Sequence, residues 1–374
     1  MKNYNVHLES EVSNSFRCVK AANSLDIDSK KKSVHEFQIE AEITEDFNIG
    51  LIVGASGSGK TTLAESVWGE MNNILADDLP VIDQFPDSMT YEECAKCLTG
   101  VGLTSVPCWI RPVYTLSNGQ KARAEVALRL AGSNDLEVID EWTSVVDRTV
   151  AKVMSHCVHK YAKKSKRKIV LLSCHYDVID WLQPDWIIDC NKQTYEDRRL
   201  LQQSRKEILK FDIREVSRKS WKYFSKYHYL SDKLAGGHIE TFGLFHNDEQ
   251  IGFACYANYV PWGNKLKKEI MHANRIVVHP DYCGLGLGIH LFSETAKIMV
   301  DRNYQVMSKF SSEPVAKAMT KHPHWELKKV QRAMKTIIGG NMLRDSGFRE
   351  KVKTYSFAWI GGGTDNALHE KQSN

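Results

Sequence analysis

The chain has 374 residues, with 50 lysines and arginines against 46 aspartates and glutamates, and a formal net charge of +4. This length suffices for two separately packed domains, and 42% hydrophobic with 26% charged residues is an ordinary globular mix. The mildly basic balance is compatible with a nucleic-acid partner without requiring one, and no apolar run approaches membrane-spanning length, which excludes a pore formed by this chain alone.

The nine cysteines are scattered, and the first 30 residues lack the apolar stretch of a signal peptide. We therefore expect reduced thiols and a cytoplasmic location, which would be the host cytoplasm if the chain is viral. Cys94 and Cys97 form a CxxC pair, but no second pair has metal-ligand spacing, so the pattern does not favour zinc.

The first half of the chain alternates strand and helix patterns. Residues 1–32 are polar, and we expect a loose N-terminal arm there. HEFQIEAEI, residues 35–43, alternates apolar and polar positions and predicts a strand. FNIGLIVGA predicts a buried strand, KTTLAESVWGEM the helix after it, and LEVIDEW and KIVLLSCH two further buried strands. This alternation indicates an α/β domain over residues 33–192.

The second half has a different pattern. The charged, weakly apolar segment after Cys190 predicts a linker over residues 193–210. HIETFGLFH and QIGFACYANYV then predict a β-hairpin across NDE, RIVVHPDY predicts a strand, and GLGIHLFSETAKIMVDR predicts a helix. We therefore expect a second α/β domain over residues 211–362 and a polar tail over residues 363–374.

The stretch GASGSGKTT lies between a predicted buried strand and a predicted helix and has the spacing GxxxxGK[ST]. Glycines let the backbone wrap around phosphates, so that amide N–H groups point inward. The lysine of such a loop reaches the β- and γ-phosphates, and the following hydroxyl binds Mg²⁺. We predict an ATP site made of Gly54, Ser56, Gly57, Ser58, Gly59, Lys60, Thr61 and Thr62.

Two further motifs fit this site. Asp140 and Glu141 follow a predicted buried strand, where the first carboxylate can join the Mg²⁺ shell and the second can activate water. LSNGQ lies upstream: Ser117 can cap a helix whose N-terminus points at phosphate, and Gly119 permits close approach.

With these motifs in this order, residues 33–190 resemble the ABC-type ATPases. The resemblance identifies VIDQF as a glutamine loop, LSNGQ as the signature and SVVDR as a D-loop with Asp147. It implies that His175 in LLSCH is a switch histidine and catalytic residue beside Glu141. It also implies a magnesium shell of Thr61, Gln84 and Asp140.

The same resemblance implies a head-to-tail homodimer, in which Ser117 and Gly119 of one subunit close over ATP held by Lys60 of the other. Two features depart from the family. Asn118 stands where the signature usually has glycine, and the segment between Gln84 and Ser117 is short. The short segment leaves little helical subdomain to dock on the membrane part of a transporter.

A second glycine loop, RIVVHPDYCGLGLGIHLF, lies between a predicted strand and a predicted helix. In this context residues 211–361 resemble the GNAT acyltransferases. The resemblance implies that loop amides at a helix N-terminus bind the pyrophosphate of acetyl-CoA or another acyl-CoA. Cys283 departs from the glutamine or arginine that the family favours. The resemblance assigns acyl-CoA binding to Val277, Val278, Gly284, Leu285, Gly286, Leu287 and Gly288.

WKYFSKYHYLSDKL, residues 221–234, is aromatic and basic and allows two interpretations. It is an amphipathic helix with its aromatic rings in the core, or it lines an acceptor pocket with His228 and Tyr229 as catalytic residues. In the second case its rings stack a base and its cations bind phosphate. The stretch resembles the phage Mom-type DNA-modifying proteins, GNAT relatives that alter adenine. Residues 308–335 are similarly a solvated helix face or a basic strip facing a polyanion.

The predicted fold class is α/β, with a P-loop ABC-type ATPase domain followed by a GNAT-like acyltransferase domain. The leading functional prediction is an ATP-hydrolysing protein that modifies DNA or RNA by acyl transfer, with ATP, Mg²⁺ and acyl-CoA as cofactors. Two alternatives stay open. One is an ATP-regulated N-acetyltransferase of a protein or small amine, and the other is a non-catalytic ATP-switch binding protein.

Overall fold

A computed structural model of the chain describes residues 2–10, 13, 15–24, 33–72, 74–132, 135–200, 209–228, 233–259, 269–333 and 352–363. The chain has two compact units, Met1–Ile208 and Leu209–Asn374. None of the helices in the described ranges is long and apolar enough to cross a bilayer.

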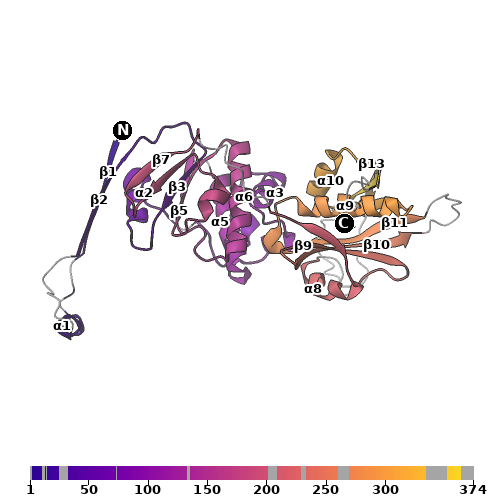
Figure 1. Cartoon of the computed structure of the whole chain (residues 1–374), viewed down its shortest axis with the longest axis horizontal. Coiled ribbons are helices and arrows are strands. Elements are labelled where there is room, and N and C mark those ends of the chain that lie inside the picture. Colours follow the sequence, from indigo (N-terminus) through magenta and orange to yellow (C-terminus); the bar gives the residue numbers. More distant parts are fainter. Residues whose placement is uncertain are drawn as a thin grey trace, which may run out of the picture. The chain divides into compact units, whose positions relative to one another are not determined.

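The N-terminal unit contains a five-stranded sheet in the order β4-β5-β3-β6-β7, in which β3 pairs in parallel with both β5 and β6 (Figure 1). Every residue of β3 is buried, as expected for a central parallel strand covered on both faces. The strands are β1 Lys2–Ser10, β2 Ser33–Ala41, β3 Ile49–Val53, β4 Leu136–Ile139, β5 Lys168–Ser173, β6 Trp186–Asp189 and β7 Thr194–Asp197. The helices are α1 Phe16–Ser24, α2 Lys60–Trp68, η1 Val81–Gln84, α3 Tyr91–Gly100, α4 Val106–Trp109, η2 Val113–Thr115, α5 Asn118–Ala131, α6 Arg148–Ser165 and α7 Val178–Leu182.

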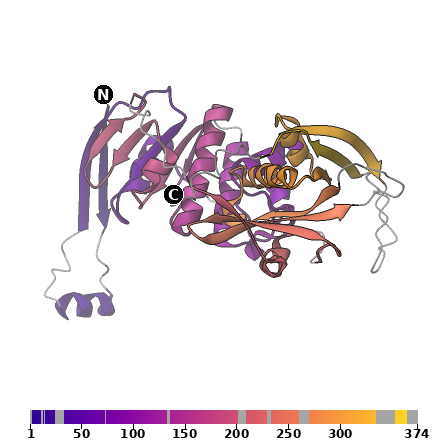
Figure 2. The same ribbon diagram turned by 45° about the vertical axis from the view of Figure 1, so that its right-hand side comes forward.

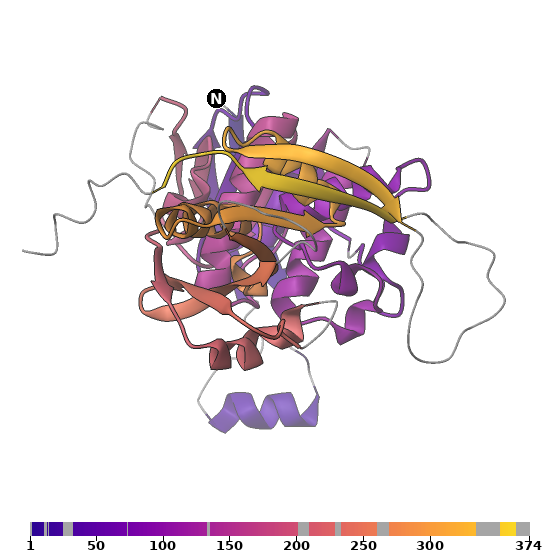
Figure 3. The ribbon, with the colours of Figure 1, turned by 90° about the vertical axis from the view of Figure 1, so that its right-hand side faces the viewer.

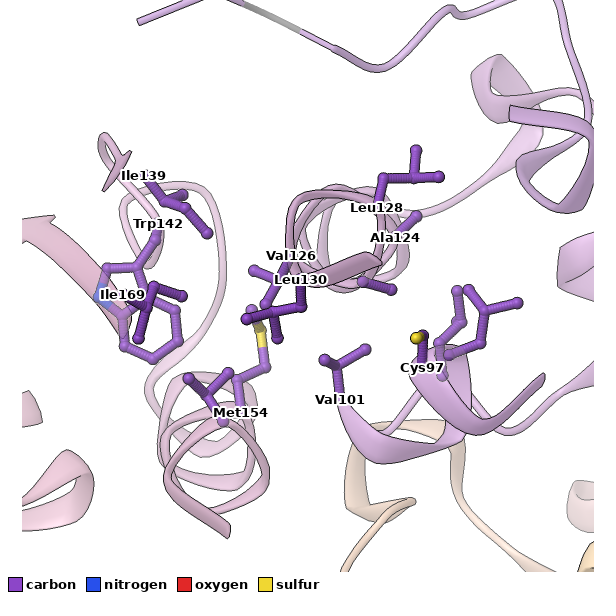
Figure 4. Close-up of a cluster of buried hydrophobic side chains, with 14 of the residues drawn as sticks. Cys97, Val101, Ala124, Val126, Leu128, Leu130, Ile139, Trp142, Met154 and Ile169 are labelled. Carbon is purple, nitrogen blue, oxygen red and sulfur yellow. The ribbon is translucent and has the colours of Figure 1, made fainter. Parts of the chain in front are cut away.

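Alternate residues of β3 point to two separate cores. Leu51 packs into the core that α3, α5, α6 and α7 form, whereas Ile52 packs into the core under α2 and the β1–β2 pair. In the first core, Val126 and Leu130 of α5 point toward Met154 of α6 (Figure 4). Strand β3 is thus anchored on both faces, which fixes the position of the loop at its end.

The predicted loose arm over residues 1–32 is wrong for its first part. Strand β1 pairs antiparallel with β2 along its whole length, from Lys2↔Ala41 to Ser10↔Ser33, and α1 follows at the far end of the pair (Figure 2). Val6 is buried in the core under α2. The alternation in NYNVHLES is the strand signal, and pairing with β2 supplies the hydrogen bonds that a polar arm would leave to water. Residues 25–32 lie outside the described part.

The predicted linker over residues 193–210 also begins too early. Strand β7 pairs antiparallel with β6 and belongs to the sheet of the N-terminal unit. A tight turn connects the two strands, and Gln193 adopts φ +55° there. The unit ends at Ile208, and residues 201–208 lie outside the described part.

The C-terminal unit contains a seven-stranded sheet in the order β13-β14-β12-β11-β10-β9-β8. The predicted hairpin is confirmed as β9 and β10, and β13 pairs with β14 as a long antiparallel pair at the edge (Figure 3). The strands are β8 Asp212–Glu215, β9 Ile239–His246, β10 Glu249–Tyr259, β11 Ile270–Val278, β12 Gln305–Phe310, β13 Trp325–Ala333 and β14 Val352–Trp359. The helices are η3 Arg218–Ser220, α8 Trp221–Phe224, η4 Ser225–Tyr227, η5 Pro280–Tyr282, α9 Leu287–Asp301 and α10 Glu313–Thr320.

Helices cover both faces of this sheet. On one face Phe292 of α9 packs on Tyr256, whose hydroxyl bonds to Thr295 Oγ1 at 2.7 Å. On the other face Trp221 and Phe224 of α8 belong to a buried cluster with Phe253, Cys255 and Val277. Helices α8 and α9 therefore lie on opposite faces of the sheet.

The sequence allowed two interpretations for each of two segments, and in both segments the single-helix interpretation differs from the structure. In the described part, residues 221–234 contain the single turns α8 and η4, with Trp221 buried and Tyr223 exposed, so one continuous amphipathic helix is wrong there. The acceptor-pocket interpretation stays a prediction, and residues 229–232 lie outside the described part. Residues 308–335 span the end of β12, helix α10 and strand β13, so a single helix face is wrong there.

Candidate functional site

The loop between β3 and α2 turns at glycines. Gly57 and Gly59 have φ of +78° and +84°, a region in which a side chain would clash with the backbone. Gly59 immediately precedes α2 and has no side chain to cap it, so the N–H groups of the first helical turn stay available. Nothing lies within 4 Å of a Cβ built on Gly57. This side of the loop is therefore open to a ligand.

Lys60 turns back into this loop. Its side chain is buried, and Nζ donates hydrogen bonds to the carbonyl oxygens of Gly54 at 2.9 Å and Ala55 at 2.8 Å. Ser58 Oγ is buried and has no hydrogen-bond partner among the described residues. A Cβ at Gly54 would collide with that hydroxyl. A buried cation, an unpartnered hydroxyl and a helix N-terminus fit the phosphates of a nucleotide.

Thr61 and Asp140 meet beside the phosphate loop. Thr61 Oγ1 donates a hydrogen bond to Asp140 Oδ2 at 2.6 Å, although the two residues lie on α2 and after β4. A hydroxyl and a carboxylate are oxygen ligands of the kind that Mg²⁺ binds.

Two other residues predicted to bind ATP lie close by in the sequence. Ser56 lies in the same loop and is exposed, and Thr62 lies in the first turn of α2 and is half-buried.

Glu141 has an uncommon backbone conformation, with φ +46° in a residue other than glycine. Its N–H donates to Asp140 Oδ1 at 2.8 Å, and its carbonyl accepts a hydrogen bond from Ser144 Oγ at 2.7 Å. These contacts hold the residue in a region that costs roughly 1–2 kcal/mol. The exposed carboxylate is thereby fixed next to Asp140, in a place where it can accept a proton from water.

The signature segment forms the predicted helix cap. Ser117 precedes α5, its Oγ accepts a hydrogen bond from the N–H of Gln120, and the Gln120 side chain accepts from the N–H of Ser117. Gly119 lies against α6, because a Cβ there would be 3.3 Å from Val150 Cγ1. The predicted cap is confirmed, and Gly119 also has a packing role within its own subunit.

Gln84 ends η1 and His175 follows β5, and the roles that the resemblance implies for both residues stay predictions. The Gln84 amide exchanges hydrogen bonds with the backbone of Ala76, at 2.8 and 3.0 Å, and donates to Leu79 O at 3.2 Å. The structure thus places this amide on its own loop and does not bring it together with Thr61. His175 is half-buried after β5, and its N–H donates to Ser173 Oγ at 3.0 Å.

A set of contacts that sequence analysis missed joins the histidine loop to the phosphate loop. Tyr176 donates its hydroxyl proton to Asp189 Oδ1 at 2.9 Å and accepts a hydrogen bond from Asn191 Nδ2 at 3.2 Å. Asn191 Oδ1 accepts in turn from the N–H of Ala55 at 3.2 Å. Burial, followed by the hydrogen bond to Asp189, raises the pKa of Tyr176. The only sequence signal was the position of Tyr176 directly after His175.

The glycine loop of the C-terminal unit follows β11 and η5. Gly284 and Gly286 have φ of +95° and +81°, and Gly286 immediately precedes α9. Nothing lies within 4 Å of a Cβ built on Gly286 or Gly288. The N-terminus of a 15-residue helix with an open glycine surface fits a pyrophosphate. Cys283 Sγ lies 3.6 Å from His279 O, so its side chain folds back onto the loop.

The other residues predicted to bind acyl-CoA lie around this loop. The side chains of Val277 and Leu287 are buried, so only their backbone is available to a ligand. Val278 and Leu285 are half-buried. These four residues would therefore contribute main-chain groups and apolar contact, while the three glycines provide the close approach.

Strands β11 and β12 separate on their way to this loop. They pair in parallel only from Ile270↔Gln305 to Ala273↔Ser308. A bulge in β11 follows, because Cys255 of β10 faces Arg275 while the next residue faces Ala273. From Asn274 onward β11 has no described pairing with β12, and the Asn274 carbonyl accepts a hydrogen bond from Arg275 Nη1 instead, so this edge of β11 offers backbone groups to an extended ligand.

His228 lies on the face of the sheet that α8 covers. Its ring packs edge-on against Trp221, with 5.7 Å between the ring centroids. Burial, followed by the charge of Arg275, lowers the pKa of His228 to about 4. The imidazole is therefore neutral at physiological pH and can accept a proton. Tyr229, the other predicted catalytic residue, lies outside the described part.

Residues 176–320 match the model of the acetyltransferase (GNAT) family. The matched range begins in the N-terminal unit, whereas the first strand of the C-terminal sheet begins at Asp212. For the N-terminal region, the energy-coupling factor transporter ATP-binding protein EcfA1 of Staphylococcus aureus is 26% identical over 182 residues, which cover 38% of this chain and 67% of the relative.

Two solved structures are similar at low identity. The post-hydrolysis dimer of the ATP-binding cassette MJ0796 bound to ADP and Pi has 15% identity and a TM-score of 0.36, covering 44% of this chain and 92% of that one. Arabidopsis thaliana NAA60 with a bisubstrate analogue has 11% identity and a TM-score of 0.33, covering 41% of this chain and 100% of that one. From the motifs, the family model and the curated relative, the chain combines an ABC ATPase-like N-terminal domain with a C-terminal GNAT acetyltransferase domain.

Proposed function

We propose that this protein hydrolyses ATP and transfers an acyl group from acyl-CoA to a nucleic acid. The observation that carries the choice of acceptor is the surface of η3, α8 and η4. It comprises Arg218, Lys219, Lys222, Tyr223 and Lys226, and we call it the basic α8 surface. All five side chains are exposed, and none of the four cations forms an ion pair with a described carboxylate. Such unpaired cations suit a chain of phosphates.

Aromatic rings accompany these charges. Tyr223 is 46% exposed, and Lys226 Nζ lies 4.8 Å from the ring centroids of both Tyr223 and Tyr227. An exposed aromatic ring beside cations is the combination by which proteins bind single-stranded nucleic acid, through base stacking and phosphate contact. The basic α8 surface lies on the same side of the sheet as His228, which favours an acceptor that approaches from this side.

In the C-terminal unit, different residues would bind the cofactor and accept the proton during the transfer reaction. The glycine loop and the N-terminus of α9 would hold the pyrophosphate, and the free edge of β11 after Asn274 would hold the extended part of the cofactor. When bound, acyl-CoA supplies the acyl group as a thioester. Neutral His228 would take the proton from the acceptor nitrogen as that nitrogen bonds to the acyl carbon and the sulfur leaves.

The N-terminal unit would act as a dimer. Lys60, Thr61 and Asp140 would hold Mg²⁺ and nucleotide, and Ser117 and Gly119 of a second subunit would close over it. Glu141 would activate water, with His175 beside the γ-phosphate. Closure and release of the dimer would gate access of the nucleic acid or remodel it, which gives ATP hydrolysis a role in the reaction.

The test is transfer of radiolabel from acetyl-CoA by the full chain to DNA, tRNA and protein, each with and without ATP. We expect label in nucleic acid, and we expect the Glu141→Gln variant to bind ATP but to lose hydrolysis by about 10²–10⁴-fold, as when a general base is removed. Label found only in protein or a small amine would instead support an ATP-regulated N-acetyltransferase. No label and no affinity for acetyl-CoA would leave a non-catalytic ATP switch.

A further inference from the structure

Arg275 occupies an unusual position in the C-terminal unit. It lies on β11 directly after the bulge at Asn274, where β11 and β12 separate. Its Nη1 donates to Asn274 O at 2.7 Å and its Nη2 donates to Lys233 O at 2.9 Å. Its Nε is buried and has no hydrogen-bond partner among the described residues. The guanidinium is therefore half-buried, and carbonyl dipoles are its only described partners.

A second arginine acts on the same region. Burial raises the pKa of the Cys255 thiol to about 11, and the charges of Arg275 and Arg218 act in the opposite direction. Arg275 is the direct cross-strand partner of Cys255. Arg218 lies three residues before Trp221, which packs with Cys255 in the buried cluster under α8, so both arginines belong to the region around this side chain of β10. Arg218 is exposed and is part of the basic α8 surface. The two cations approach this place from different elements, β11 and η3.

Carboxylates balance other arginines of the unit but not these two. Arg214 forms ion pairs with Asp212 and Asp248, and Arg302 with Glu215 and Glu240. In the described part of the chain no carboxylate forms an ion pair with Arg218 or Arg275. Since a half-buried charge without a counter-charge is costly, the region is electrostatically prepared for an anion.

We propose that Arg275 and Arg218 bind an anionic group of the acceptor substrate, a phosphate, next to the nitrogen that receives the acyl group. This inference rests on the proposed acyl transfer, because it places the anion where β11 and β12 separate. A phosphate is favoured over a carboxylate because the adjacent basic α8 surface offers further unpaired cations, as a polyphosphate chain requires.

The experiment measures binding of thymidine 5′-monophosphate, inorganic phosphate, acetate and unphosphorylated thymidine to the full chain by calorimetry. Saturating Mg-ADP and coenzyme A are present, so that the two glycine loops do not contribute. We expect thymidine 5′-monophosphate to bind most tightly and unphosphorylated thymidine not to bind. Arg275→Gln should weaken the binding at least about tenfold, as expected when a charge-assisted partner is lost. The matched control Arg214→Gln removes an arginine that carboxylates already pair, and it should leave the affinity unchanged.

Arg275 also holds Lys233 and Asn274 in place, so its loss can disturb the fold. Arg218 lies at the surface, so Arg218→Gln tests the anion site without disturbing the fold. It should lower the affinity for thymidine 5′-monophosphate by about threefold to tenfold. Equal binding by wild type, Arg218→Gln and Arg275→Gln would overturn the anion site. Preference for acetate would overturn the assignment to phosphate. Separate titration with acetyl-CoA distinguishes the two proposals, because phosphate binding without acetyl-CoA binding would overturn acyl transfer and leave the anion site standing.

Discussion

The phosphate loop and the glycine loop after β11 turn in the same way but have different surroundings. Gly59 and Gly286 each precede a helix, with φ and ψ of 84° and 13° in the first and 81° and 8° in the second. A Cβ at Gly59 would lie 2.6 Å from the ring of Phe37, whereas nothing lies within 4 Å at Gly286. One backbone conformation is thus enclosed by packing in the N-terminal unit and open in the C-terminal unit.

The first helical residue differs as well. Lys60 begins α2 and turns its buried ammonium group into the phosphate loop, whereas the residue that begins α9 is Leu287, which is buried in the core. The first loop therefore combines backbone amides with a cation, and the second relies on amides and the helix dipole alone. The terminal phosphates of a nucleotide, the ligand proposed for the first loop, carry more charge than the pyrophosphate diester proposed for the second, and the cation of the first loop suits that difference.

Removal of the cation should give the largest effect. Lys60→Ala should weaken ATP binding by about 10–100-fold, because the β- and γ-phosphates lose a charged hydrogen-bond donor. Filter binding of labelled ATP measures the change, and affinity for acetyl-CoA is the internal control. If ATP affinity is unchanged, Lys60 is not the cation that binds the phosphates. A cation would then no longer distinguish the first loop from the second.

The paired variants Gly59→Ala and Gly286→Ala test whether packing distinguishes the loops. Both force a side chain into the left-handed region, at about 1–2 kcal/mol. Gly59→Ala must also displace the buried ring of Phe37, so it should destabilise its unit more. Hydrogen exchange followed by mass spectrometry measures the protection of backbone amides in each unit separately. Equal loss of protection in both would mean that the enclosure of Gly59 has no energetic consequence.

The difference in surroundings also explains which parts of the molecule could be predicted. The glycine turns before α2 and the helix cap at Ser117 depend on local sequence, and the structure contains both. Strand β1 was missed because its alternating pattern is short and polar, and the partner that stabilises it, β2, begins only at Ser33. The prediction took 193–197 as linker for the same reason, since β7 is defined by its pairing with β6.

The site residues that the sequence analysis missed also depend on contacts between segments far apart in the sequence. Tyr176 reaches Asp189 and Asn191 because β5 and β6 flank β3 in the sheet, an order that the sequence does not reveal. Arg275 is a candidate anion-binding residue because it lies where two strands separate and because it has no described carboxylate partner. Neither observation has a local sequence pattern, whereas the glycines proposed to bind phosphate do.

Gly288→Ala separates ligand binding from stability in the second loop. Gly288 lies in the first turn of α9 in open space, so alanine should fit and should add up to about 1 kcal/mol of helix propensity. Its methyl group would occupy the surface that a pyrophosphate must approach, and affinity for coenzyme A should fall about tenfold. Thermal unfolding and calorimetry measure the two effects. Unchanged affinity would place the pyrophosphate away from this glycine, and ATP binding should stay as in wild type.

The smallest expected effect concerns His228. Its pKa is about 4 in the folded chain, first because of burial and then because of Arg275, against 6.5 in an exposed histidine. As pH falls from 6.5 to 4, the unfolded chain takes up a proton that folded His228 does not, so the free energy of unfolding decreases over this window. Above pH 6.5 the group is neutral in both states and contributes no pH dependence.

His228→Gln should therefore flatten the decrease of stability between pH 6.5 and pH 4, as measured by urea unfolding at several pH values. His272 has a pKa shifted in the same direction by burial, so the relevant quantity is the difference between wild type and variant. The control His290→Gln changes an exposed histidine of α9 and should keep the slope of the wild type. If His228→Gln keeps that slope as well, His228 is protonated in the folded chain, and the unit that holds Arg275 then tolerates a second cation beside it. That result would restrict His228 as the proton acceptor to pH values above about 6.5, because a protonated imidazole has no free lone pair to offer the acceptor nitrogen.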